Sequence, residues 1–227
     1  KKDGASAGFE IAFCITFFTG LLMWLLTRRY KRELIPRDGF LLVTMAWVLL
    51  ALAATIPLYV NIEGISFVHA FFEATSGITT TCGTILSGLD RLPLSVNFWR
   101  CFLAWMGGIG ILVMAVAVLP LLGVGGSQIF RAESSGPMKE GRLTPRIADT
   151  AKAFYNIYLA ISVACAVCYH FAGMDWDDAI MHTFTTVSLG GYSSHDAGFA
   201  YWPGRAVDWV CVVFLLIGGI NFSMHFI

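Results

Sequence analysis

Five long stretches of this sequence contain no charged residue, and they restrict the chain to a small set of folds. They are residues 11–27, 39–62, 101–130, 153–174 and 209–227. Each is about long enough for a helix to cross a hydrocarbon layer roughly 30 Å thick at about 1.5 Å per residue. Only 13% of the 227 residues are charged, whereas 57% are hydrophobic. The sequence therefore predicts an all-α integral membrane protein with five spanning helices.

Composition disfavours several other classes of protein. Fifteen Lys and Arg balance fifteen Asp and Glu, so the basic excess typical of a nucleic-acid binder is missing. The hydrophobic content is too high for a disordered chain, and six cysteines are few for a disulfide scaffold. The opening residues Lys1-Lys2-Asp3-Gly4 lack the layout of a signal peptide, and we interpret them as a chain that begins within a loop.

Basic residues concentrate in two of the connections between the predicted spans. Lys and Arg are retained on the cytoplasmic side of a membrane, whereas acidic residues contribute little, so both connections are predicted to be cytoplasmic. The stretches 63–100 and 173–208 contain few basic residues, with acidic residues in the majority among their charged ones, and are predicted to lie outside. The basic residues of the two cytoplasmic connections are Arg28, Arg29, Lys31, Arg32 and Arg37, and Arg131, Lys139, Arg142, Arg146 and Lys152.

Each outer stretch contains a helix-like segment that is too short to span the membrane. These segments are residues 65–78 and 176–188. If either one crossed the membrane, the orientation of every later loop would be reversed, so we predict that both enter the membrane and return to the same side. Irregular backbone at membrane depth is tolerated only where it is buried in protein or lines a water-filled path. Two re-entrant segments therefore indicate a pore.

The chain resembles itself at an offset of about 110 residues. Leu34-Ile35-Pro36-Arg37 aligns with Leu143-Thr144-Pro145-Arg146, and Met106-Gly107-Gly108-Ile109 aligns with Ile217-Gly218-Gly219-Ile220. The repeated unit is a span, a re-entrant segment and a second span, and one extra span precedes the two units. Parallel repeats around an axis along the membrane normal can build a central pathway. The Gly-Gly pairs permit close helix approach, although ordinary helix packing would also explain them.

A polar loop follows each short helix, and the two loops align at an offset of 109, with Cys82 opposite Gly191. A cation filter needs backbone carbonyls that replace the hydration shell of the ion, and glycine permits the backbone angles that this requires. The preceding helix can direct the negative end of its dipole toward the ion. A polar turn is the alternative for either loop alone. The candidate ion-binding residues are Thr79, Thr80, Thr81, Cys82 and Gly83 in the first loop and Ser188, Leu189, Gly190, Gly191 and Tyr192 in the second.

These motifs together point to a known family. Leu189-Gly190-Gly191-Tyr192-Ser193 resembles a degenerate Thr-Val-Gly-Tyr-Gly filter of potassium channels. The whole chain resembles the membrane subunit of the bacterial Trk-type potassium uptake systems, in the Trk/Ktr/HKT superfamily. Further matching landmarks are Arg37-Asp38-Gly39-Phe40, Glu73-Ala74-Thr75-Ser76-Gly77, Trp105-Met106-Gly107-Gly108-Ile109-Gly110, Leu119-Pro120, Arg131-Ala132-Glu133, Gly136-Pro137-Met138-Lys139, Leu143-Thr144-Pro145-Arg146-Ile147-Ala148 and Asn221-Phe222-Ser223-Met224-His225-Phe226.

The resemblance implies a potassium pore built from four units of helix, pore helix, filter loop and helix. This chain would supply two of the four, as a partial chain. Its expected parts are an extra transmembrane helix with a basic cytoplasmic loop (1–37), a first pore repeat (38–122), a cytoplasmic loop (123–146) and a second pore repeat (147–227). The resemblance also implies a lipid-embedded homodimer of complete chains in the bacterial inner membrane, gated by a cytoplasmic nucleotide-binding regulatory subunit.

Three mechanisms remain open at this point. The first is potassium-selective conduction through the filter, without catalysis. The second couples potassium uptake to protons or sodium. The sequence has no obvious in-membrane carboxylate relay, which argues mildly against such coupling. The third is an intramembrane enzyme built on Cys or His, which predicts reactive groups clustered at one depth, and none is visible. No catalytic residue and no transition-metal site are therefore assigned, and potassium is the expected transported ion.

Cys82 departs from the glycine that this family usually has in its first filter. Either the loop shifts by one residue so that Gly83 takes this place, or the side chain is natural or engineered and weakens potassium selection. Serine at this position accompanies sodium permeation in some relatives. We hypothesise that Cys82→Gly increases or preserves the preference for potassium.

Four other features allow a functional and a structural interpretation. Glu73 either attracts cations or braces the pore loop, and bracing is favoured because its counterpart in the second unit is His182. Cys165 and Cys168 are interpreted as small buried thiols rather than as a metal or redox site. The acidic residues of 175–178 either concentrate cations or begin a helix. Loop 123–146 is either a solvated linker or, by resemblance, the docking site of the regulatory subunit.

Overall fold

The computed structural model describes residues 4–30, 36–121 and 143–220. Over these ranges the chain is helical and contains no β-strand. The α-helices are α1 (Ser6–Thr27), α2 (Pro36–Asn61), α3 (Phe67–Ile78), α4 (Leu94–Leu121), α6 (Leu143–Phe171), α7 (Trp176–Val187) and α8 (Ala206–Gly219), and the short 3₁₀ helices are η1 (Leu89–Arg91) and η3 (Gly198–Tyr201). The predicted all-α fold class is confirmed.

The long helices correspond to the uncharged stretches. Within the described residues, Ser6–Thr27, Phe40–Asn61 and Ala151–Phe171 are long and apolar enough to cross a membrane, and Ala206–Gly219 is a shorter apolar helix. Helix α4 begins at Leu94 and includes Arg100, so it starts before the uncharged run at residue 101. Residues 221–227 of the fifth predicted span lie outside the described residues.

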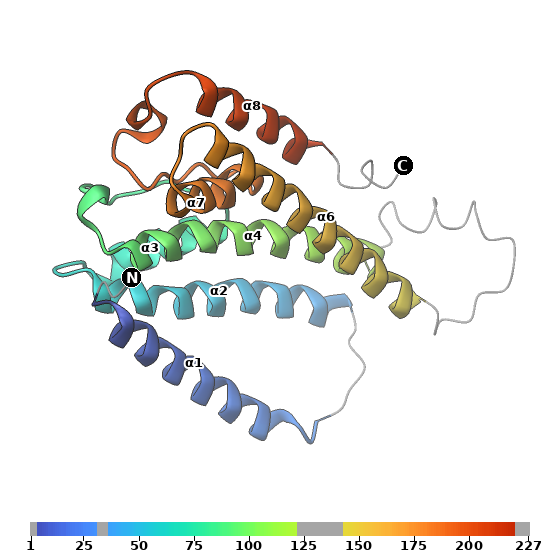
Figure 1. The fold of residues 1–227 in the computed structure, drawn as a ribbon. Helices are drawn as coiled ribbons and strands as arrows, with labels where there is room; N and C mark the ends of the chain where they lie inside the picture. The colour runs from blue at the N-terminus through green and yellow to red at the C-terminus, as the bar shows by residue number, and fades with distance from the viewer. Residues whose placement is uncertain (1–3, 31–35, 122–142, 221–227) are drawn as a thin grey trace, which may run out of the picture.

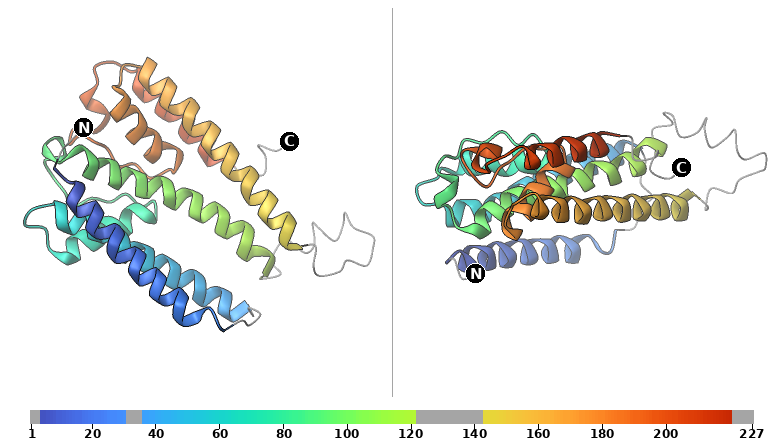
Figure 2. Two further views of the ribbon diagram at one scale, coloured as in Figure 1. Left: turned by 60° about the horizontal axis from the view of Figure 1, so that its bottom comes forward. Right: turned by 45° about the horizontal axis from the view of Figure 1, so that its top comes forward.

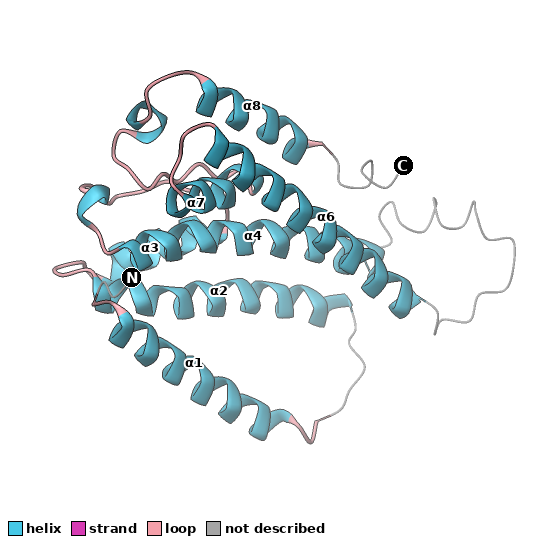
Figure 3. Cartoon of the chain, in the orientation of Figure 1, coloured by secondary structure: helices cyan, strands magenta, loops and turns pink. Residues whose placement is uncertain are grey.

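Helices α3 and α7 are the two short helices expected from the sequence, and they lie at the same end of the bundle (Figures 1 and 2). The end of α1, the start of α2, the end of α4 and the start of α6 lie at the opposite end. Loops without regular structure gather around α3 and α7 (Figure 3). Both short helices and the polar loops that follow them therefore occupy one half of the bundle.

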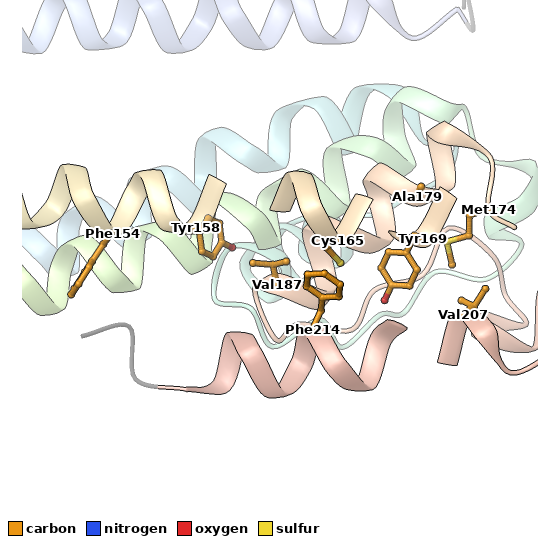
Figure 4. Packing of buried hydrophobic residues seen from close by; sticks show 9 residues of the cluster. All are labelled: Phe154, Tyr158, Cys165, Tyr169, Met174, Ala179, Val187, Val207 and Phe214. Atoms are coloured by element: carbon orange, nitrogen blue, oxygen red, sulfur yellow. The ribbon is translucent and has the colours of Figure 1, made fainter. Parts of the chain in front are cut away.

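Helix α4 joins the two halves of the chain. It contacts α2 and α3 of the first half and also α6 and α7 of the second. One apolar cluster fills the space between α2, α3 and α4, and it includes Leu58, Ala74 and Leu103. A separate cluster lies among α6, α7 and α8 (Figure 4). A third, small cluster of Cys101, Met181 and Tyr192 lies where the halves meet.

Cys165 and Cys168 behave as packing residues in this arrangement. Cys165 is fully buried in the α6–α7–α8 cluster, and Cys168 packs against the same cluster. Both are free thiols. In the part of the chain that the structure describes, no group of three or more His, Cys, Asp or Glu is placed to hold a metal ion.

Candidate functional site

The first candidate filter loop, residues 79–83, turns back along α3. Hydrogen bonds from the Thr80 N–H to the Gly77 carbonyl (2.9 Å) and from the Cys82 N–H to the Ser76 carbonyl (3.0 Å) close the turn. Thr80 and Cys82 have φ angles of 57° and 50°, in the left-handed region that non-glycine residues rarely enter. The polar sequence therefore forms a loop with two strained backbone positions separated by one ordinary residue.

The second candidate filter loop, residues 188–192, has the same backbone pattern. Its two left-handed residues are Leu189, with φ 59°, and Gly191, with φ 112°. At an offset of 109 residues, Leu189 corresponds to Thr80 and Gly191 to Cys82. The Leu189 N–H donates to the Thr186 carbonyl (3.0 Å), which corresponds to the hydrogen bond from the Thr80 N–H to the Gly77 carbonyl in the first loop. The two loops are thus equivalent in backbone conformation as well as in sequence position.

A hydroxyl group of each short helix holds the far end of its loop. In the first loop Ser76 Oγ donates to the Gly83 carbonyl (2.8 Å). In the second loop Thr185 Oγ1 donates to the Tyr192 carbonyl, also at 2.8 Å. Both members of the second pair lie 109 residues after those of the first. Each loop is therefore folded against its own helix by the same contact.

The side chains at positions 73 and 182 make the next equivalent contact. Glu73 accepts a hydrogen bond from Thr84 Oγ1 (2.8 Å), and His182 Nε2 lies 3.1 Å from Ser193 Oγ. Glu73 also accepts from the Ile85 N–H (3.3 Å). Of the two roles considered for Glu73, these contacts match bracing of the loop. A side chain with these bonds and no exposed surface is poorly placed to attract ions from solution.

Arg100 is the residue of this candidate site that the sequence did not predict. Its Nε donates to Glu73 Oε1 (2.8 Å), while its two terminal nitrogens donate to Asn97 Oδ1 and Thr84 Oγ1, both at 2.9 Å. The Arg100 side chain has no exposed surface. A buried carboxylate requires a partner because burying an unpaired charge is costly. The lone acidic residue in the short helix was thus a usable signal for a nearby basic residue.

The ten candidate residues divide by exposure. Thr79, Thr81, Gly83, Leu189 and Gly191 are exposed, and Thr80, Cys82 and Gly190 are partly buried. Ser188 and Tyr192 are buried, so the Tyr192 side chain points into the protein. The loops touch side by side at Cys82, because its Sγ lies 2.5 Å from where a Cβ on Gly190 would be.

One glycine of each Gly-Gly pair in α4 and α8 lies against the carboxyl end of a short helix. A Cβ added at Gly107 would collide with the carbonyl of Ile78, the last residue of α3. A Cβ at Gly218 would lie 3.2 Å from the carbonyl of Val187, the last residue of α7. Gly107 and Gly218 are aligned in the repeat, and both positions require close approach of a helix terminus to the backbone.

Residues 195 and 196 join the loop that follows α7 to residues 88–90, which lie between α3 and α4. Asp196 accepts hydrogen bonds from the N–H groups of Gly88 (3.0 Å) and Leu89 (3.1 Å). His195 contacts Asp90 through Nδ1 and Asp178 through Nε2 (3.1 Å). Asp178, one of the predicted acidic cluster, is therefore engaged within the protein as well as beginning α7.

The electrostatics of this contact favour a charged His195. Partial burial lowers the His195 pKa, but the hydrogen bonds to Asp90 and Asp178 outweigh it and raise the pKa above its ordinary value. The hydrogen bond from His195 lowers the pKa of Asp90. The His195 ring also stacks on Tyr201, with ring centres 3.6 Å apart.

Comparison with known proteins shows extensive similarity. The TrkH family, described as cation transport proteins, matches residues 5–227. The chain is 48% identical over 226 residues to the Trk system potassium uptake protein TrkH of Vibrio parahaemolyticus, covering 99% of this chain and 47% of that protein. It is 44% identical to TrkH of Escherichia coli K12 over the same shares of the two chains. It is 40% identical to the Escherichia coli K12 uptake protein TrkG, covering 100% of this chain and 47% of that protein.

A solved structure agrees with these sequence matches. The crystal structure of the potassium transporter TrkH from Vibrio parahaemolyticus superimposes with a TM-score of 0.86 at 45% identity, covering 98% of this chain and 44% of that one. The chain spans about half the length of the relatives it matches.

Proposed function

Because this chain belongs to the TrkH family of cation transport proteins, we propose that it forms half of a potassium-uptake pore in the bacterial inner membrane. Its relatives are transport proteins, and the chain is accordingly a transport protein and not an enzyme. The observation that carries the proposal is the matching pair of left-handed residues in the two loops, Thr80 with Cys82 and Leu189 with Gly191.

Potassium binds in this proposal to backbone carbonyls of residues 79–83 and 188–192. Alternation of left-handed with ordinary residues allows successive carbonyls to turn toward one side of a loop. The loops leave the carboxyl ends of α3 and α7, where the helix dipole is negative and favours a cation. The ten residues include no acidic side chain, so selection of potassium rests on carbonyl coordination.

The complete pore requires further units. The two pore repeats that we propose, 38–122 and 147–227, correspond to two sides of a four-sided path. Gly108 packs against Ser188 of the second repeat, whereas its counterpart Gly219 has, among the described residues, no neighbour within 4 Å of an added Cβ. In the full-length protein this position faces the next repeat. Homodimerisation of complete chains and gating by a nucleotide-binding regulatory subunit belong to the same proposal.

Conduction is favoured over coupled symport by the environment of Glu73. This carboxylate of the short helix is ion-paired with Arg100 at 2.7 Å and has no exposed surface. A proton relay requires a carboxylate that water or other relay groups can reach, whereas Glu73 is enclosed by Arg100, Thr84 and the Ile85 N–H. Coupling predicts that collapse of the proton or sodium gradient abolishes concentrative uptake even when the membrane potential is clamped.

The test is transport by the full-length protein in a bacterium that lacks its own potassium uptake systems. We expect rescue of growth at low potassium and uptake of rubidium as a potassium substitute. Failure of both, with the protein present in the membrane, overturns the proposal.

Docking of the regulatory subunit to loop 123–146 has its own test. Most of this loop lies outside the described residues, so the argument rests on its charge. Reversal of charge at Arg131, Lys139 and Arg142 is expected to abolish co-purification of the subunit. Unchanged binding assigns the loop to a solvated linker.

A further inference from the structure

Tyr192 belongs to the second loop, but its side chain reaches the first half of the pore. Its hydroxyl donates a hydrogen bond to the Glu73 carbonyl at 2.9 Å, between residues separated by 119 positions. The same hydroxyl lies 3.5 Å from the carbonyl of Gly83, at the end of the first loop. Only 3% of the Tyr192 surface is exposed. The phenol group thus connects the second loop to α3 and reaches the end of the first loop.

Arg100 holds the ring of Tyr192 in this position. The guanidinium carbon lies 4.5 Å from the ring centre, which is a cation–π contact. The guanidinium group is itself fastened to Glu73, Asn97 and Thr84. Cys101 and Met181 complete the surroundings as members of the same buried cluster. A ring packed this closely has little freedom to change its rotamer.

Among the described residues, the contact has no counterpart in the other repeat. The loops and short helices align at an offset of 109, so Tyr192 corresponds to Gly83 and Glu73 to His182. Helices α4 and α8 align through their Gly-Gly pairs at an offset of 111, so Arg100 corresponds to Cys211. Gly83 has no side chain, and Cys211 has no guanidinium group that could hold a ring. The hydroxyl-to-carbonyl contacts that shape each loop are present in both repeats, whereas the contact through Tyr192 is present once. Formation of a single loop therefore does not require it.

We infer that Tyr192 is a positioning residue for ion selection, whose phenol group, held by Arg100, sets the separation between the two filter loops. The inference rests on the proposed function, because it assigns Tyr192 a role in the same pore. A filter distinguishes potassium from the smaller sodium ion when its carbonyls are kept from closing around sodium. A buried ring between adjacent loops opposes that closure. The Tyr192 hydroxyl also anchors the backbone beside Gly83.

The main test is Tyr192→Phe in the full-length protein, with potassium and sodium permeability compared from reversal potentials. The substitution keeps the ring and its contact with Arg100 but removes the hydrogen bond to the Glu73 carbonyl of α3 and the 3.5 Å contact with the Gly83 carbonyl. Loss of one such bond, if expressed fully in ion selection, lowers the potassium-to-sodium permeability ratio by about fivefold. The ratio does not depend on the amount of protein, so lower expression alone leaves it unchanged.

Tyr169→Phe is the matched control. Tyr169 is also buried, and its hydroxyl lies 2.7 Å from Thr186 Oγ1 of α7. This contact is within one repeat and joins no two loops. The control removes a buried phenol hydroxyl beside the second short helix, so we expect it to preserve the permeability ratio.

Arg100→Lys is the second variant, which decides the matter if Tyr192→Phe does not reach the membrane. Lysine keeps the positive charge near Glu73 but lacks the planar group that stacks on the ring. We expect a fall in the permeability ratio, and in the double variant a fall no greater than that of the more severe single variant, because both act through one contact.

The outcomes separate this inference from the proposed function. Wild-type ion ratios in both single variants, with normal potassium uptake, overturn the role of Tyr192 and leave the pore proposal intact. An equal fall in the Tyr169→Phe control overturns it as well, since the effect would then follow from any lost hydroxyl. Absence of potassium transport by the unmodified protein rejects the proposed function itself.

Discussion

The Arg100 guanidinium lies 2.7 Å from the Glu73 carboxylate, and neither side chain has any exposed surface. The pair connects α4 to α3, and Thr84 and the Ile85 N–H also bind the carboxylate. An ion pair of this kind is weak evidence for added stability, because desolvation offsets the attraction. Its consequence is geometric: the pair and its hydrogen bonds hold residues 84 and 85, which follow the first loop, against α3.

Glu73→Gln is expected to destabilise the full-length protein by about 3–5 kcal/mol, because it leaves the Arg100 charge buried without a counter-ion. Thermal unfolding of the purified protein measures the change. Glu63→Gln is the control, since Glu63 is exposed. Equal effects of the two substitutions would show that the buried pair is not special.

Gly107→Ala is expected to cost about 1–3 kcal/mol by overpacking, because the new methyl group collides with the Ile78 carbonyl. Gly218→Ala should cost less, since its Cβ would lie 3.2 Å from the Val187 carbonyl. Gly20→Ala is the control: it is helical, has no neighbour within 4 Å, and is expected to be neutral or stabilising. Unfolding temperatures that do not follow this order contradict the packing account.

The contact of His195 with Asp90 and Asp178 predicts a dependence of stability on pH. The folded state raises the His195 pKa above the unfolded value of about 6.5, so the stabilisation is fully present below that pH. It is lost as pH rises through the higher folded pKa. Asp90, whose pKa is lowered, acts in the opposite sense and loses its contribution only in acid, as pH falls below about 3.8 through its folded pKa.

His195→Gln removes this titration, so the stability advantage of the unmodified protein over the variant should shrink as pH rises from about 6.5, the unfolded pKa, through the higher folded pKa of His195. Unfolding temperature across this range measures the difference. His69→Gln is the control because His69 is exposed. An advantage that is constant with pH would refute the assignment of charge to His195.

Cys82→Gly is expected to preserve or increase potassium preference. Cys82 has a φ of 50°, and a left-handed conformation costs a non-glycine residue about 1–2 kcal/mol. Glycine removes both this strain and the sulfur atom beside Gly190. Cys82→Ala separates the two effects because it removes only the sulfur. Reversal potentials that shift toward sodium in Cys82→Gly argue against the hypothesis.

Much of the fold was predictable because membrane burial imposes strong rules on sequence. A helix in lipid must satisfy its own backbone, so uncharged runs of sufficient length could be assigned to α1, α2, α4 and α6. The offset of 109 residues predicted that Cys82 and Gly191 are equivalent, and both have positive φ angles. The offset could be recognised from the sequence because the second repeat has glycine at position 191, where the backbone has a positive φ.

The partners of the buried polar groups were not predictable to the same degree. Arg100 stands at the edge of an uncharged run, where sequence alone cannot distinguish a residue of an outer loop from one inside the protein. Tyr192 was assigned to the second loop from its backbone position, but nothing in the local sequence indicates that its side chain lies against Glu73.

The sequence by itself determined the membrane class, the two repeats and the loops that carry their polar residues, because spacing and hydrophobicity act along the chain. Only the tertiary structure decided that Glu73 pairs with Arg100 and that the Tyr192 hydroxyl binds the Glu73 carbonyl of α3. The physical reason is that burial obliges each polar group to find a partner, while the packing of α3, α4 and α7 determines which partner is within reach.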